Sequence, residues 1–221
     1  MSKLKAVMFD MDGILIDSER MNMNMWDVVN EERGHVFDIS ILTRMMGGSP
    51  QDNWEKYGHL LPTMEVYNDM KKEVRKRVAE DVDANGMPQR PGVEAMMQAL
   101  KENGIRRLIV SSTPRENALH VLEKADLADK FDNGIFGDEA GRRKPYPDLY
   151  LKMMEMEGLK PEETIIVEDS SNGVMSGYAA GVRVFAIPDT APLEQFRDKE
   201  AYRIVDSMDD VREWVLEEIG K

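Results

Sequence analysis

The chain of 221 residues contains no cysteine. Disulfides, thiolate metal ligands and a cysteine nucleophile are therefore excluded, and the absence is typical of proteins from a reducing compartment. The sequence also has no apolar run near the ~20 residues that a membrane helix needs. Only four apolar residues in a row precede Asp10, fewer than the apolar region of a secretory signal peptide requires. We therefore expect a cytoplasmic protein that does not act in a membrane.

The sequence also has few basic residues relative to acidic ones. Lysine and arginine number 29 against 42 acidic residues, which gives a formal charge of −13 and an isoelectric point near 4.8. Nucleic-acid binding needs a basic face that displaces counterions, so we expect no nucleic-acid partner. An acidic protein still binds an anion where a metal ion, a lysine or a helix N-terminus supplies local positive charge. The basic run KKEVRKR at 71–77 is flanked by acids, and we interpret it as a solvated helix face.

Four short apolar runs end in polar residues, and helix-like segments separate them. The runs are AVMF before Asp10, RLIV before Ser111, TIIV before Glu168 and VRVFAI before Pro188. Strand–helix alternation with continuously apolar strands predicts an α/β fold, a doubly wound, Rossmann-like parallel sheet with helices on both faces. Ligands of such sheets bind at the carboxyl ends of the strands, where three of these polar sites fall.

One region interrupts the alternation, because residues 16–84 contain no convincing buried strand. Three stretches there are helix-like, at 17–34, 49–58 and 63–83. We expect a small α-helical cap domain over 16–87, inserted after the first strand, and an α/β core formed by 1–15 and 88–221. The linkers would lie at Leu15–Ser18 and at Asp83–Gly92, which is rich in glycine and proline. With both ends beside the first strand, the insert would cover the site as a lid.

Asp10 and Asp12 raise the first chemical question. Residues two apart on an extended chain point the same way, so the two carboxylates would converge and repel each other. A cation such as Mg²⁺, which prefers oxygen ligands, would relieve that repulsion. A lone pair of this kind is more often a turn or a helix cap. Here Ser111, Lys144 and Glu168–Asp169 follow in order, and three of the four sites lie at strand ends, which is hard to explain as coincidence.

The ordered motifs DMDGIL, SST, KPYPDLY and EDSSNG resemble the motif set of the haloacid dehalogenase-like (HAD) superfamily. The resemblance covers nearly the whole chain, and the helical insert is similar to the small α-helical cap of that family. The segment DMDGILIDSE at 10–19 is similar to the pattern of the β-phosphoglucomutase-like and sugar-phosphate phosphatase branch.

The resemblance implies roles for the acidic residues. Asp10 would be the nucleophile that accepts the phosphoryl group, and Asp12 the general acid and then base. Mg²⁺ would be held by the Asp10 carboxylate, the backbone carbonyl of Asp12 and Asp169, with Glu168 as a direct or supporting ligand. Asp12 also favours phosphoryl transfer over dehalogenation, because a halide leaves without a proton.

The resemblance also implies an anion site for the phosphoryl group. Ser111 and Ser112 would hydrogen-bond its oxygens, and Lys144 would neutralise its charge and that of Asp10.

Two cap positions bear on the choice between a phosphatase and a mutase. Mutases of this branch carry a histidine and an arginine where this chain has Asn22 and Pro50, although Gly48 and Ser49 keep the cap-loop pattern. We therefore expect a Mg²⁺-dependent phosphatase acting on a sugar or polyol phosphate. The resemblance to this branch also implies a monomer. A β-phosphoglucomutase-like phosphomutase is the first alternative, and a non-catalytic HAD-like binding protein is the second.

Overall fold

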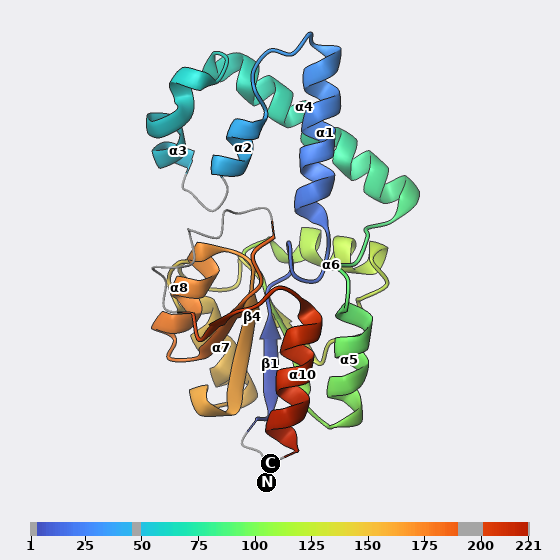
Figure 1. Ribbon diagram of the computed structural model, residues 1–221, viewed down its shortest axis with the longest axis vertical. Helices are drawn as coiled ribbons and strands as arrows, with labels where there is room; N and C mark the ends of the chain where they lie inside the picture. Colours follow the sequence, from blue (N-terminus) through green and yellow to red (C-terminus); the bar gives the residue numbers. More distant parts are fainter. Residues whose placement is uncertain (1–3, 46–49, 190–200, 221) are drawn as a thin grey trace.

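The computed structural model describes residues 4–45, 50–189 and 201–220. Its centre is a parallel sheet of six strands in the order β3-β2-β1-β4-β5-β6 (Figure 1). The strands are β1 (Ala6–Phe9), β2 (Arg106–Val110), β3 (Asn133–Ile135), β4 (Thr164–Glu168), β5 (Arg183–Ala186) and β6 (Arg203–Ile204). The predicted α/β parallel sheet is confirmed.

Strand β1 occupies the middle of the sheet and sets the register of the site. Phe9 lies beside Ile109 of β2 and beside Val167 of β4. Every residue of β1 and β4 is buried, which explains why both are continuous apolar runs instead of alternating ones. The residues that follow β1, β2 and β4 therefore emerge together at one edge.

Helices cover both faces of the sheet. Helices α5 (Val93–Glu102), α6 (Arg115–Lys124) and α10 (Met208–Ile219) lie over one face, and α7 (Asp148–Glu157) and α8 (Ser171–Ala179) over the other. Each face has its own apolar cluster: one contains Phe9 and Trp214, and the other contains Met8 and Tyr150. The doubly wound arrangement is thus confirmed.

Four helices between β1 and β2 form a separate body above the carboxyl edge of the sheet: α1 (Ser18–Glu32), α2 (Ser40–Met45), α3 (Pro50–Tyr57) and α4 (Met64–Asn85) (Figure 1). Buried apolar side chains join these helices in a third cluster, formed by Trp26, Val29, Phe37, Leu42, Met70 and Val74. We propose that these helices are the cap, with the division at 16–87 that the sequence suggests. Gly48 and Ser49 lie outside the described residues.

The two connections between these bodies run side by side. The Asp17 N–H donates to the Pro88 carbonyl at 2.9 Å, and the Arg90 N–H donates to the Leu15 carbonyl at 3.0 Å. Ile16 and Gln89 form an antiparallel bridge between these bonds. The second connection is shorter than expected, because α4 continues to Asn85 before Gly86, with φ of 85°, ends it.

No helix in the described ranges is long and apolar enough to cross a membrane.

Candidate active site

The predicted site residues come from four loops at one edge of the sheet. Asp10 directly follows β1, Ser111 directly follows β2, and Glu168 is the last residue of β4. Lys144 reaches the same point from the loop before α7. Asp10, Ser111 and Glu168 are buried although they are polar, so each needs a partner inside the protein.

Lys144 links two of the acids. Its Nζ lies 2.5 Å from Oδ1 of Asp10 and 2.6 Å from Oε1 of Glu168, and it donates to the carbonyl of Val110 at 2.9 Å. The lysine side chain is only 6% exposed. All three ammonium hydrogens are therefore used, and the side chain is held in one orientation.

Burial and charge together shift the acid–base behaviour of this group. Burial raises the pKa of Asp10 to about 8, against the lowering effect of Lys144 and with further raising by Glu168. The pKa of Asp169 is raised well above its ordinary value, first by burial and then by Asp10 and Glu168. Burial disfavours the Lys144 ammonium, but the charges of Asp10 and Glu168 outweigh this and hold its pKa well above its ordinary value. The cluster therefore carries more negative charge than one ammonium offsets.

Three of these carboxylates fit a divalent cation. Asp10, Glu168 and Asp169 each offer an oxygen, and these oxygens lie within 4.8 Å of one another. Oxygens on opposite sides of a Mg²⁺ ion are roughly 4 Å apart, and the ion prefers carboxylate ligands. The donor set thus suits a hard cation, which would relieve the repulsion that adds to burial in raising the pKa of Asp10 and Asp169.

Two glycines let these carboxylates approach the backbone. A Cβ on Gly13 would lie 2.0 Å from Oδ2 of Asp169, and a Cβ on Gly173 would lie 1.9 Å from the carboxyl carbon of Glu168. Any side chain at either position would displace the acid that it meets. The glycines of the first and last motifs therefore shape the acidic cluster.

Asp12 lies beside this cluster but faces other partners. Ser18 donates to its Oδ1 at 2.7 Å, and Thr113 donates to its Oδ2 at 3.0 Å. Both oxygens of the Asp12 carboxylate thus have hydroxyl donors, while its charge still contributes to raising the pKa of Asp10. A metal bond through the backbone carbonyl of Asp12 stays a prediction, as does its acid–base role.

The two serines of the second motif make different contacts. Ser111 is 1% exposed, and its Oγ accepts a hydrogen bond from the Thr113 N–H at 3.0 Å. Ser112 lies in the same turn, with its carbonyl packed against Gly137. Phosphate binding by Ser111 and Ser112 stays a prediction.

Sequence reasoning missed the residues that hold these groups in place. Tyr150 donates to Oε1 of Glu168 at 2.7 Å, and Ser170 donates to Oε2 at 3.2 Å. Ser18 and Thr113, which hold Asp12, were also missed. All four residues lie inside the motifs given above. The spacing of residues in a motif does not indicate which acid a hydroxyl will contact.

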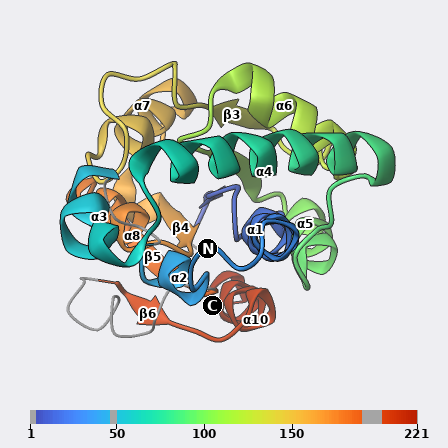
Figure 2. The same cartoon turned by 90° about the horizontal axis from the view of Figure 1, so that it is seen from above.

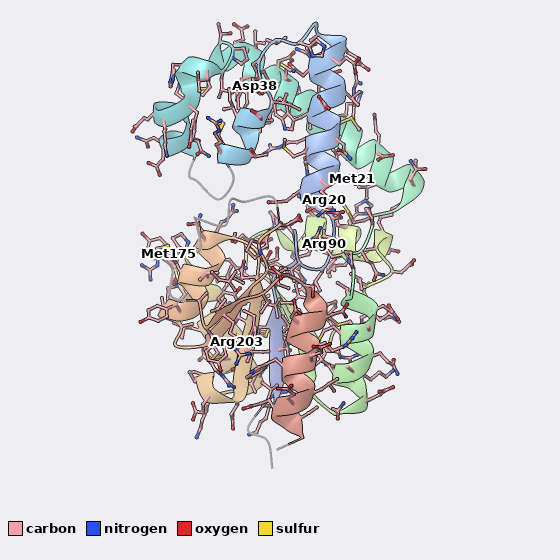
Figure 3. The ribbon with its side chains drawn as sticks, viewed as in Figure 1. Arg20, Met21, Asp38, Arg90, Met175 and Arg203 are labelled. Carbon is pink, nitrogen blue, oxygen red and sulfur yellow. The ribbon has the colours of Figure 1, made fainter. Side chains whose placement is uncertain are left out.

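A group of charged residues ties the two connections to the core. The Asp189 carboxylate forms ion pairs with Arg90 at 2.9 Å and with Arg20 at 3.0 Å. Arg90 also forms an ion pair with Asp17 at 3.3 Å. Figure 3 shows Arg20 and Arg90 together where α1 enters the cap. The second oxygen of Asp189 has no hydrogen-bond partner among the described residues. We call these four residues the hinge cluster.

The four helices of the proposed cap line an open cavity of about 760 Å³. Seen from above, these helices surround the projected ends of β1 and β4 (Figure 2). Asn22 lines the cavity and donates to the carbonyl of Ser18 at 2.8 Å. Within the basic run KKEVRKR, Lys72, Arg75 and Lys76 are exposed, and Lys71 and Arg75 also line this cavity.

Comparisons with known proteins agree with this geometry. The sequence model of the haloacid dehalogenase-like hydrolases matches residues 7–187. The phosphorylated carbohydrates phosphatase of Thermotoga maritima is 30% identical over 188 residues, covering 83% of this chain and 85% of that protein.

Two solved structures share the fold. A HAD family hydrolase from Deinococcus radiodurans R1, with bound phosphate and sodium, superimposes with a TM-score of 0.79 and 24% identity, covering 99% of this chain and 97% of that one. The β-phosphoglucomutase of Clostridium difficile gives a TM-score of 0.70 and 22% identity, covering 98% of this chain and 97% of that one.

Proposed function

The chain belongs to the haloacid dehalogenase-like hydrolase family, and on this premise we propose that it is a Mg²⁺-dependent phosphatase of small phosphorylated metabolites. We propose a sugar or polyol phosphate as the substrate, because the relative from Thermotoga maritima is a phosphatase of phosphorylated carbohydrates. An aspartyl-phosphate formed on Asp10 would be the intermediate.

One observation carries the proposal. The Asp10 carboxylate lies between the Lys144 ammonium, at 2.5 Å, and two further carboxylates suited to a divalent cation. A nucleophile for phosphoryl transfer needs a fixed position and nearby positive charge, since positioning and charge stabilisation supply most of the rate. A divalent cation, when bound, would offset charge on the phosphoryl oxygens, and Asp10, Glu168 and Asp169 would hold it.

The residues divide the reaction into two steps. A carboxylate oxygen of Asp10 attacks phosphorus, forming an acyl phosphate bond while the ester P–O bond breaks. The leaving alkoxide takes a proton from Asp12. The Asp12 carboxylate then removes a proton from a water molecule, which attacks phosphorus, frees Asp10 and releases inorganic phosphate. Ser18 and Thr113, which donate to the two oxygens of Asp12, would orient it in its carboxylate state.

Ser111, Ser112 and Lys144 would bind the phosphoryl group during both steps. Lys144 favours the charged form of Asp10, because the ammonium lowers the pKa that burial raises to about 8. A divalent cation, when bound, would add to this effect and favour the nucleophilic carboxylate.

A release assay tests the proposal. Purified protein is incubated with sugar and polyol phosphates, with and without Mg²⁺, and inorganic phosphate is measured. We expect Mg²⁺-dependent release from at least one of them and its loss in Asp10→Asn. Equal release by Asp10→Asn would refute the nucleophile.

The mutase alternative is tested in the same experiment. Asn22, at the position where mutases carry histidine, favours the phosphatase, whereas the side chain of Pro50 lies outside the described residues. Conversion of β-glucose 1-phosphate to glucose 6-phosphate without phosphate release would favour the mutase.

A further inference from the structure

Methionine supplies all the sulfur of this chain. The sequence has 18 methionines and no cysteine, so the thioether is the only sulfur group that an oxidant can modify. Methionine is also concentrated in the first helix of the four-helix body, where residues 21–25 read MNMNM. The proposed reaction gives these residues no role.

The methionines differ in how far solvent reaches them. Met8 and Met96, which belong to the core domain, are 0% exposed. Met64, the first residue of α4, is 45% exposed, and Met23 on α1 and Met45 on α2 are half-buried. A small oxidant in water therefore reaches the second group in the folded protein, whereas the first group is reached only when the core opens.

Three of the accessible methionines meet at one place. Met23, Met45 and Met64 come from three different helices, and all three line the cavity of the four-helix body. We call them the cavity methionines. Met23 and Met45 also pack against the buried apolar cluster that contains Trp26 and Leu42. A chemical change at these thioethers therefore alters the cavity lining and the packing of the helices together.

Oxidation of a thioether is a two-electron transfer of one oxygen atom. The sulfur attacks the terminal oxygen of a hydroperoxide, the O–O bond breaks, and the proton passes to the departing oxygen. The products are a sulfoxide and water, or an alcohol from an organic peroxide. The sulfoxide is polar, whereas the thioether is apolar and only a weak acceptor. Placing a sulfoxide against an apolar cluster costs free energy where no donor is near.

The helix that carries Met23 also carries groups that act on the proposed active site. Glu19 on α1 lines the cavity, and its charge contributes to raising the pKa of Asp169. Ser18, the first residue of α1, donates to Asp12. A displacement of α1 therefore changes the surroundings of two acids of that site.

We propose that the cavity methionines form a site of reversible sulfoxidation by hydroperoxides, and that sulfoxides there loosen the four-helix body and thereby lower activity. The reverse step needs a dithiol, which supplies two electrons and leaves thioether, disulfide and water. The modification and the loosening do not depend on the proposed phosphatase function. The effect on activity rests on it.

Peptide mass spectrometry after treatment with hydrogen peroxide tests the site. We expect one added oxygen at each of the cavity methionines while Met8 and Met96 stay unmodified. Met156 is the matched control, because it is 50% exposed near the end of α7 and does not line the cavity. Its oxidation should proceed at a rate similar to that of Met64. Cavity methionines that stay unmodified when Met156 is oxidised overturn the proposal.

Urea unfolding followed by tryptophan fluorescence tests the loosening, since Trp26 and Trp54 both line the cavity. Peroxide treatment of the wild type should raise the unfolding equilibrium constant about 10-fold, because a polar group then lies against apolar side chains. Methionine sulfoxide reductase with dithiothreitol should restore the original curve, and this reversal needs no variant. An unchanged curve after oxidation, or one that reduction does not restore, overturns the proposal.

Variants assign the effect to the cavity methionines. The triple variant Met23→Leu/Met45→Leu/Met64→Leu keeps apolar volume and removes the thioethers, so peroxide should leave its unfolding curve unchanged. The control Met156→Leu/Met175→Leu should respond as the wild type does. Met175 is 40% exposed on α8 of the core and does not line the cavity (Figure 3). Equal responses of the triple variant and the wild type overturn the assignment.

Phosphate release distinguishes the failure of this proposal from that of the proposed function. With Mg²⁺ and a sugar phosphate, peroxide should lower release by the wild type and not by the triple variant. Release that stays unchanged although the cavity methionines are oxidised overturns the effect on activity. If the untreated protein releases no phosphate, the proposed function fails, while mass spectrometry and urea unfolding still decide the sulfoxidation site.

Discussion

Replacing Arg90 with methionine removes the central cation of the hinge cluster. The methionine keeps most of the apolar length of the side chain, so the change isolates the charge. Arg90 is 13% exposed and Asp189 is 2% exposed, so the variant leaves a buried carboxylate with one partner fewer. It also removes the contact with Asp17 at 3.3 Å.

The structure sets the expected cost. Removing one partner of a buried ion pair costs roughly 3–5 kcal/mol, because the other charge stays buried. Arg20 remains 3.0 Å from Asp189 and offsets part of this, which leaves about 2–3 kcal/mol of lost unfolding free energy. At ~2–4 °C per kcal/mol for a protein of this size, the melting temperature should fall by roughly 4–12 °C.

Urea unfolding followed by circular dichroism and tryptophan fluorescence measures the loss. The matched control is Arg20→Met, because Arg20 binds the same carboxylate from a side chain that is 58% exposed. Exposed pairs contribute only ~0–1 kcal/mol. The reasoning is refuted if Arg90→Met stays within about 0.5 kcal/mol of the wild type, or if Arg20→Met costs more, since burial would then not determine the cost.

Three further expectations concern the site. Asp12→Asn should lower kcat roughly 10²- to 10⁴-fold while the circular dichroism spectrum stays that of the wild type; phosphate release at the wild-type rate would contradict its acid–base role. Tyr150→Phe should cost about 1.5–3 kcal/mol of unfolding free energy, because the buried Glu168 loses a donor, and an unchanged urea midpoint would argue against this. Because burial raises the pKa of Asp10 from 3.8 to about 8, the folded protein without metal keeps a proton that the unfolded chain releases. Its stability should therefore fall as pH rises from about 4 to 8 in the presence of a chelator. Asp10→Asn should show a smaller fall, and parallel pH profiles in urea would contradict this.

The sequence predicted the central strands because burial on both faces leaves a visible pattern. The runs before Asp10, Ser111 and Glu168 became β1, β2 and β4. Strands β3 and β6 were not anticipated, since Asn133–Ile135 and Arg203–Ile204 are short and lie at the edges of the sheet. Their pairing is determined by neighbouring strands and not by a periodicity of their own.

The convergence of Asp10, Lys144 and Glu168 was predictable from their order and from their places in the motifs. The partners of Asp12 were not, because a hydroxyl can turn to several acceptors and only the packed structure selects one. The side chains that line the cavity of the four-helix body were not predictable either. Lys71 and Lys72 look alike in a basic run, and only the angle of α4 on its neighbours decides which of them faces the cavity.

The paired connections at Ile16 and Gln89 bring the start and the end of the four-helix body to neighbouring points. All six strands of the sheet come from outside the polypeptide between those points, which contributes only a few side chains, such as Val82 and Met87, to the core. A body of different length or shape could be spliced in at that junction while Asp10 and Lys144 kept their places. Exchange of this body could consequently change substrate preference while the residues proposed to act on the phosphate ester stay in place.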